Sequence, residues 1–211
     1  MIFVKICGIT RLEDAIAAAD LGARALGFNF YKKSKRYIQP EKAVEIIEHL
    51  PGHILKVGLF VNSPEDEIEN INSRLDLDLL QFHGDETPEF CKKWGDKVIR
   101  AFRIESENQL EEIKKYSFAR MIIIDAAIAG QFGGTGELSD WDLSLKAKKY
   151  GIPLLLAGGL TPANVSEAIQ KVKPFGVDVA GGVESSPGIK EREKVRAFMH
   201  SVRRGMDQLD R

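Results

Sequence analysis

The sequence predicts a single-domain α/β fold in which eight parallel strands close into a barrel with helices on the outside. Eight short apolar runs of β type alternate with amphipathic helical runs along the whole chain. No linker, low-complexity segment or shift in composition divides the 211 residues. Eight successive strand–helix units are also the number that closes the (β/α)8 barrel, or TIM barrel.

The expected elements follow one another in a regular order. Strands are predicted at residues 3–7, 25–30, 55–61, 79–82, 97–102, 121–125, 153–157 and 176–179. Thr10 to Glu13 has the pattern of a capping box ahead of the first helix. Thr161-Pro162 places a capping residue before a proline ahead of a later helix. We expect the barrel to occupy residues 1–205 and residues 206–211 to form a polar C-terminal tail.

An open, doubly wound sheet is the alternative architecture. The chain is near the lower limit of roughly 200 residues for a barrel, so its loops must be brief. No Gly-x-Gly-x-x-Gly follows the first strand, which disfavours the dinucleotide-binding version of the open sheet. We therefore favour the closed barrel.

Composition restricts the class of partner. The 30 basic and 31 acidic residues give a net charge of −1, which provides no general attraction for nucleic acid or an anionic membrane. No apolar run approaches the ~20 residues that span a bilayer, and no signal peptide is evident. Two cysteines make no disulfide framework, and no His/Cys/Asp cluster has metal-ligand spacing. We expect a cytoplasmic monomer or homodimer without a metal.

Glycine pairs follow the last two predicted strands. They are Gly158-Gly159 and Gly181-Gly182. In this architecture the loops after strands seven and eight often bind phosphate, because glycine lets backbone N–H groups approach an anion closely. The pairs therefore predict a phosphorylated small-molecule substrate, with ordinary turn glycines as the alternative.

Cys7 and Asp125 stand at the carboxyl ends of two predicted strands, where active sites of such barrels form. A thiolate can accept a proton from carbon, and a carboxylic acid can protonate an oxygen. Together they suit the isomerisation of a phosphorylated sugar by proton transfer. The alternatives are a buried, unreactive cysteine for Cys7 and a loop-capping role for Asp125.

Other polar residues share these strand ends. Arg36 follows the second strand within a run of lysines that we interpret as solvated, and it could hold a substrate carboxylate. His83 ends the fourth strand, and we interpret it as a loop residue bonded to backbone rather than a catalyst. Lys5 shares the inward parity of Cys7; it could form a Schiff base, but we favour an ion pair with Asp178 on the strand that closes the barrel.

Taken in order, these residues resemble the phosphoribosylanthranilate isomerase family of tryptophan synthesis. The resemblance covers the whole chain, and the ordered set is more specific than any one motif. Its markers are Lys5-Ile6-Cys7-Gly8, Ser34 to Arg36, Leu80-Gln81-Phe82-His83-Gly84, Asp125, Gly133-Gly134-Thr135-Gly136, Asp140-Trp141 and Ala157-Gly158-Gly159-Leu160.

The resemblance implies an Amadori rearrangement without a cofactor, from N-(5-phosphoribosyl)anthranilate to 1-(o-carboxyphenylamino)-1-deoxyribulose 5-phosphate. It implies that Asp125 is the general acid and Cys7 the general base. Arg36 would hold the anthranilate carboxylate, and the two glycine pairs would hold the phosphate. Separately from the resemblance, we expect Lys5, Gln81, His83 and Asp178 to support the site.

The chain departs from the family's usual pattern in two places. Ala180 and Gly181 replace two serines, so hydroxyl contacts to phosphate are lost and we expect a raised KM. Lys35 replaces a proline before Arg36. Two further hypotheses are a related isomerase of histidine synthesis, disfavoured by Cys7, and an inactive phosphate-binding barrel, disfavoured by the pairing of Cys7 with Asp125.

Overall fold

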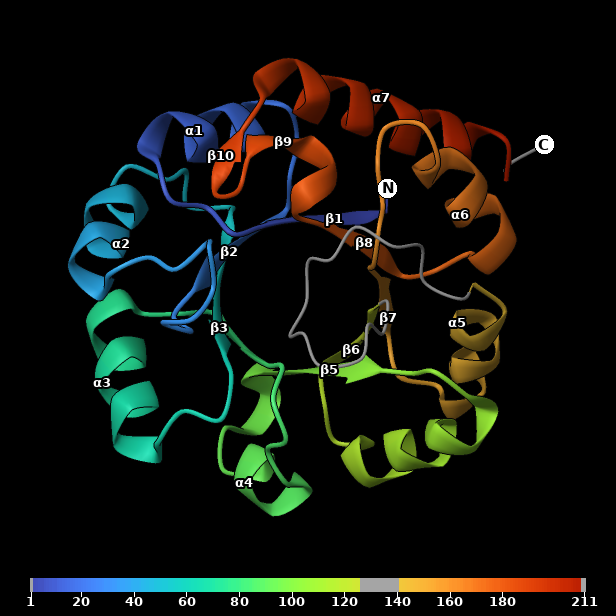
Figure 1. The fold of residues 1–211 in the computed structure, drawn as a ribbon, viewed down its shortest axis with the longest axis horizontal. Helices are drawn as coiled ribbons and strands as arrows, with labels where there is room; N and C mark the ends of the chain where they lie inside the picture. Colours follow the sequence, from blue (N-terminus) through green and yellow to red (C-terminus); the bar gives the residue numbers. More distant parts are fainter. Residues whose placement is uncertain (1, 126–140, 210–211) are drawn as a thin grey trace.

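The computed structural model describes residues 2–125 and 141–209. Its eight parallel strands pair in sequence order, and β8 pairs with β1 to close the barrel (Figure 1). The strands are β1 Phe3–Cys7, β2 Ala25–Asn29, β3 Leu55–Phe60, β4 Leu79–Phe82, β5 Val98–Arg103, β6 Met121–Asp125, β7 Leu154–Leu156 and β8 Gly176–Val179. The predicted closed barrel is confirmed, and the open sheet is excluded.

Helices surround the barrel (Figure 1). They are α1 Leu12–Asp20, α2 Pro40–Ile47, α3 Glu65–Leu75, α4 Pro88–Lys92, α5 Trp141–Ala147, α6 Val165–Val172 and α7 Arg192–Asp207. A 3₁₀ helix, Glu107–Tyr116, connects β5 to β6, and shorter ones lie at Gly95–Lys97, Lys148–Tyr150 and Gly181–Val183. A hairpin of β9 (Glu184–Ser186) and β10 (Ile189–Lys190) precedes α7. Helix α7 continues two residues beyond the boundary expected at 205.

Two expected helix caps are formed differently. Thr10 does not cap α1, because its hydroxyl donates instead to the carbonyl of Gly188 in the β9–β10 turn. The helix after Thr161 begins only at Val165. There, the side-chain oxygen of Asn164 accepts from the backbone N–H of Thr161, so the polar groups close a turn ahead of the helix. Neither Thr10 nor Thr161 is therefore the N-cap of the helix that follows it.

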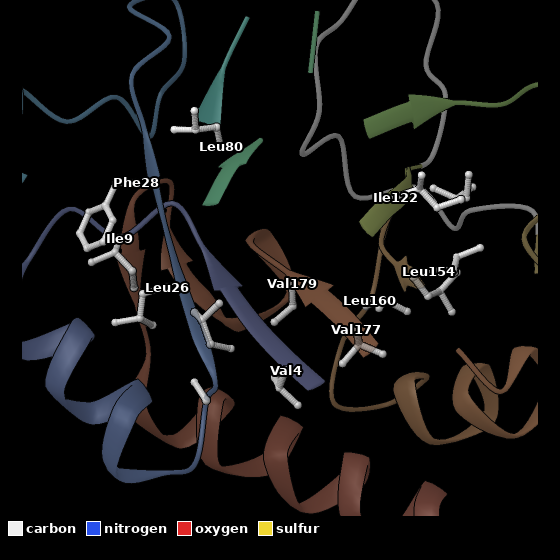
Figure 2. Packing of buried hydrophobic residues seen from close by; sticks show 14 of the residues in the cluster. Val4, Ile9, Leu26, Phe28, Leu80, Ile122, Leu154, Leu160, Val177 and Val179 are labelled. Atoms are coloured by element: carbon white, nitrogen blue, oxygen red, sulfur yellow. The ribbon is translucent and has the colours of Figure 1, made fainter. Parts of the chain in front are cut away.

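Outward-facing strand residues pack against the helices to form the larger core. Because side chains of a strand alternate, Val4, Leu26 and Val177 point away from the barrel axis. Figure 2 shows these side chains gathered between the strands and the surrounding helices. Each is at most 2% exposed, so this layer fixes the strands whose opposite faces form the barrel interior.

The barrel interior changes character along its axis. Its amino-terminal part is apolar and contains Ala25, Val57, Leu79, Ile99, Met121, Ile123 and Leu155. Farther along the same strands, inward positions are polar and include Lys5, Asn29, Gln81, Asp125 and Asp178. Burying so many polar groups is costly unless they are paired or functional. The carboxyl end of the barrel is therefore where a site should lie.

Candidate active site

A cavity of about 830 Å³, counting its open mouth, occupies the carboxyl end of the barrel. It is lined by Cys7, Asn29, Tyr31, Ser34, Arg36, Leu59, Val61, Gln81, His83, Asp125, Ala157, Gly158, Gly159, Leu160, Asp178, Val179, Ala180, Gly181 and Gly182. Apart from Lys5, which is buried beneath it, every site residue expected from the sequence lines this one cavity.

Cys7 lies above a buried ion pair. Lys5 Nζ is 2.9 Å from Asp178 Oδ1, and the Lys5 side chain is completely buried. Burial opposes the charge on Lys5, yet the Asp178 carboxylate and the Cys7 thiol raise its pKa above the usual value. The predicted ion pair is therefore confirmed. A lysine that is held protonated is a poor amine nucleophile, which disfavours the Schiff-base alternative.

The Cys7 thiol is subject to opposing influences. Burial raises its pKa above the usual value, the nearby Lys5 ammonium lowers it, and the Asp178 carboxylate raises it again. Gly27, the partner of Cys7 on β2, leaves room for these groups. A Cβ at Gly27 would lie 2.8 Å from Cys7 Sγ and 3.2 Å from Lys5 Nζ. Both atoms therefore crowd the same small space above the β2 backbone.

Asp125 is paired with His83 across the cavity wall. His83 Nε2 lies 3.4 Å from Asp125 Oδ2, and both residues are buried. Gln81 Nε2 lies 3.1 Å from His83 Nδ1 on the other side of the ring. The interpretation of His83 as a loop residue bonded to backbone is wrong for its ring, because both ring nitrogens face side chains, those of Gln81 and Asp125. Asp125 is distant from His83 in sequence but close to it in the barrel. His83 Nε2 thus faces the carboxylate.

A second buried ion pair fixes the loop that carries His83. Arg100 Nη1 donates to Glu86 Oε2 at 2.9 Å and to the Phe82 carbonyl at 3.0 Å. Glu86 in turn accepts from the backbone N–H of Gly84. Arg103, beside Asp125 on β5, donates to the His83 carbonyl at 2.9 Å. The backbone on both sides of His83 is therefore held by charge-assisted hydrogen bonds.

Arg36 differs from its lysine neighbours because its guanidinium has a buried partner, Glu184. Its Nε and Nη2 donate to the two oxygens of Glu184 at 2.8 and 2.7 Å. This bidentate bond is the main reason that the pKa of Arg36 is raised. Lys32, Lys33 and Lys35 are exposed, as expected of a solvated run. Arg36 alone of this run enters the cavity.

Glu184 is also bound by Lys190, whose side chain is 1% exposed. Lys190 Nζ lies 2.7 Å from Glu184 Oε1 and donates to the carbonyl of Cys7 at 2.6 Å. Burial raises the pKa of Glu184, but Arg36 and Lys190 outweigh it and the net pKa is lowered. The β9–β10 hairpin therefore links the Arg36 guanidinium to the backbone of Cys7.

The glycine pairs bring the last two loops close together. Gly158 and Gly159 have φ values of +82° and +63°, which side-chain-bearing residues rarely adopt. A Cβ at Gly182 would lie 1.8 Å from the Leu160 carbonyl oxygen, so no side chain fits. At Gly181 a Cβ would lie 3.2 Å from Arg36 Nη2. Glycine is therefore favoured at 158 and 159 by the backbone conformation and required at 182 by the lack of space.

Sequence reasoning missed several residues of the site. Asn29 accepts from the Tyr31 N–H and donates to Ser34 Oγ, which organises the loop leading to Arg36. Its inward parity with Ala25 and Gly27 could have identified it. The partners Glu184 and Lys190 gave no sequence signal, because they come from a hairpin that was not predicted. The expected markers at 133–136 and Asp140 lie outside the described residues.

Among residues 2–125 and 141–209, no group of three His, Cys, Asp or Glu side chains could hold a metal ion. Within the same ranges no helix has both the length and the apolar character needed to cross a membrane.

Comparison with known proteins gives a consistent family. The model of the family described as N-(5'phosphoribosyl)anthranilate (PRA) isomerase matches residues 4–201. An N-(5'-phosphoribosyl)anthranilate isomerase of Geobacter sulfurreducens is 49% identical over 203 residues, covering 96% of this chain and 99% of the relative.

Solved structures agree. The phosphoribosyl anthranilate isomerase of Thermotoga maritima is 40% identical with a TM-score of 0.90, over 96% of this chain and 99% of that chain. A second structure is of a phosphoribosyl anthranilate isomerase in complex with reduced 1-(o-carboxyphenylamino)-1-deoxyribulose 5-phosphate. It is 39% identical with a TM-score of 0.86, again over 96% and 99%. This chain therefore belongs to the N-(5'-phosphoribosyl)anthranilate isomerase family.

Proposed function

We propose that this protein converts N-(5-phosphoribosyl)anthranilate into 1-(o-carboxyphenylamino)-1-deoxyribulose 5-phosphate in tryptophan biosynthesis. One observation carries the proposal: Cys7 and Asp125 line one cavity together with Arg36 and the glycine-rich loops. That cavity offers an acid, a base, a cation for a carboxylate and backbone for a phosphate. A relative of the same family binds a reduced form of the product.

Asp125 acts first, as the general acid. It protonates the ring oxygen of the ribose, the bond between that oxygen and C1 breaks, and the anilino nitrogen supplies the electron pair that forms an iminium. Asp125 is left as a carboxylate facing His83 Nε2. A hydrogen bond from that nitrogen would stabilise the new negative charge and keep the carboxylate aimed into the cavity.

Cys7 then acts as the general base. Its thiolate takes the proton from C2, and the electron pair of that C–H bond moves into the C1–C2 bond as the iminium becomes an enolamine. Tautomerisation of the enolamine gives the ketone. One step donates a proton to the ring oxygen and the other removes a proton from C2. An acid on β6 and a base on β1, with the sugar between them, suit these two steps.

Arg36 binds the anthranilate carboxylate in this proposal. A guanidinium has five N–H donors, and two of them serve Glu184. The substrate is therefore bound by the edge of the guanidinium that Glu184 leaves open. Glu184 fixes the plane of the group, so the orientation of the carboxylate site is set before substrate arrives.

The phosphate is bound by backbone N–H groups of Gly158, Gly159, Gly181 and Gly182. Ala180 and Gly181 offer no hydroxyl groups here, so the interaction depends on backbone geometry. We expect a raised KM relative to relatives that have serines at these positions, with kcat retained.

The test follows the loss of substrate fluorescence as phosphoribosylanthranilate, generated in situ, is consumed. Wild type should turn over, and Cys7→Ala and Asp125→Asn should each lose about 10²–10⁴-fold in kcat. Cys91→Ala is the matched control, because burial raises the pKa of Cys91 to about 12 and it lies in the outer core, away from the cavity. No turnover by wild type refutes the proposed activity, and near-normal kcat in either active-site variant refutes the mechanism.

A further inference from the structure

The proposed mechanism requires a thiolate at Cys7, yet burial alone disfavours one. We propose that Lys5 is a positioning residue for Cys7: its buried ammonium, oriented by Asp178, stabilises the thiolate that takes the substrate proton. This inference rests on the proposed function, and it assigns to Lys5 a role beyond closing the barrel.

The backbone places the three groups together. Lys5 and Cys7 are two residues apart on β1, so both side chains point into the barrel. Asp178 is the register partner of Lys5 on β8. Lys5 Nζ is 2.9 Å from Asp178 Oδ1, and an ammonium has three donors. Donors therefore remain on Lys5 for the sulfur above it.

Gly27 shows that the ammonium and the sulfur share one space. A Cβ there would meet Cys7 Sγ at 2.8 Å and Lys5 Nζ at 3.2 Å, and the two atoms are thus no more than 6.0 Å apart. Lys5 is 0% and Cys7 7% exposed, so little water screens their interaction. An opposite charge at this range in a dry environment strongly favours the ionised form of a group.

Charged groups from several elements surround the thiol. Lys5 on β1, Lys190 on β10 and Arg36 in the loop after β2 favour the thiolate, and Asp178 on β8 opposes it. Lys190 donates to the Cys7 carbonyl, and Arg36 is bound bidentately to Glu184. Among these cations, Lys5 lowers the pKa of Cys7 most. Removing Lys5 leaves the thiol beside an anion, whereas removing the Asp178 charge leaves it beside a cation.

The experiment titrates the thiol directly. In a Cys91→Ala background, the alkylation rate of Cys7 by iodoacetamide is measured by mass spectrometry from pH 6 to pH 10. Lys5→Met should raise the midpoint by about one pH unit or more, so alkylation at neutral pH falls about tenfold. Asp178→Asn should lower the midpoint. Lys5→Arg keeps the positive charge, so its midpoint should lie closer to that of wild type than the midpoint of Lys5→Met does.

Turnover supplies the second readout. In Lys5→Met, kcat should fall with KM nearly unchanged, and kcat should recover as the pH is raised. A folded Lys5→Met protein with the wild-type alkylation midpoint overturns the inference. If Lys5→Met does not fold, Lys5→Gln is titrated in its place, and a wild-type midpoint in that variant overturns the inference. Alkylation needs no turnover, so a wild type without isomerase activity would refute the proposed function while leaving this test of Lys5 intact.

Discussion

Substituting alanine for Gly27 tests whether the space beneath Cys7 is part of the catalytic geometry. The new Cβ would lie 2.8 Å from Cys7 Sγ and 3.1 Å from Cys7 Cα, whereas ordinary contacts begin at 3.4 Å. Restoring an ordinary contact requires the sulfur to move by about 0.6 Å, the difference between 3.4 and 2.8 Å. The Cys7 backbone is held by pairing with β2 and by Lys190, so the side chain must absorb most of the shift.

The expected size follows from this displacement. A misplacement of about 1 Å at a reacting group can cost about 10²-fold in rate, so 0.6 Å should cost about tenfold or more in kcat. Overpacking a core typically costs about 1–3 kcal/mol, which for a chain of this size lowers Tm by roughly 2–12 °C.

The assay compares Gly27→Ala with Gly52→Ala in turnover and in thermal unfolding. A Cβ at Gly52 meets nothing within 4 Å, so the control should match wild type in both measurements. A Gly27→Ala protein with kcat within twofold of wild type would refute the reasoning. It would show that the sulfur can move without loss of the proton transfer.

Four further predictions concern the other side of the cavity. Gly182→Ala places a Cβ 1.8 Å from the Leu160 carbonyl oxygen, so the loop must shift, and KM in the fluorescence assay should rise about tenfold or more with kcat less affected. Glu184→Gln leaves Arg36 and Lys190 without their carboxylate, and chemical unfolding should show a loss of about 3–5 kcal/mol. The same variant should raise KM more than it lowers kcat, since Arg36 loses its fixed plane; an unchanged KM would contradict that role. Because the folded pKa of Glu184 is lowered, its contribution to stability is present above the unfolded value of ~4.3 and is lost as pH falls through the folded pKa. Urea unfolding between pH 6 and pH 3 should therefore show a smaller acid loss in Glu184→Gln than in wild type.

Much of the site could be predicted from the sequence, because strand parity and strand ends are local properties. The apolar run 121–124 leading to Asp125 indicates both a strand and its carboxyl end. The spacing of Lys5 and Cys7 places both side chains on one face of β1. In a closed parallel barrel, these local facts are enough to bring residues that are distant in the chain into one cavity.

Apart from the Lys5–Asp178 ion pair, partnerships between residues that are distant in the chain could not be predicted in the same way. The neighbour of His83 is Asp125 on β6, and nothing near His83 in the chain indicates it. Glu184 lies beyond the last barrel strand, in a hairpin without a strong β pattern, yet it determines the geometry of Arg36. Thr10 has the residue type of a helix cap, but a carbonyl from a remote turn competes successfully for its hydroxyl. Such outcomes depend on tertiary placement.

The buried ion pairs lie directly behind the side chains that face the cavity. Lys5–Asp178 lies beneath Cys7, Glu184–Lys190 behind Arg36, and Glu86–Arg100 behind the loop of His83. An ion pair of this kind adds little net stability compared with apolar residues, but breaking it is costly. The role of these ion pairs is to fix geometry. Because breaking a pair is costly, each pair holds the neighbouring cavity residue in position. Variants in these pairs should therefore lose stability and activity together, whereas variants at Cys7 or Asp125 should lose activity while the ion pairs behind the cavity stay intact.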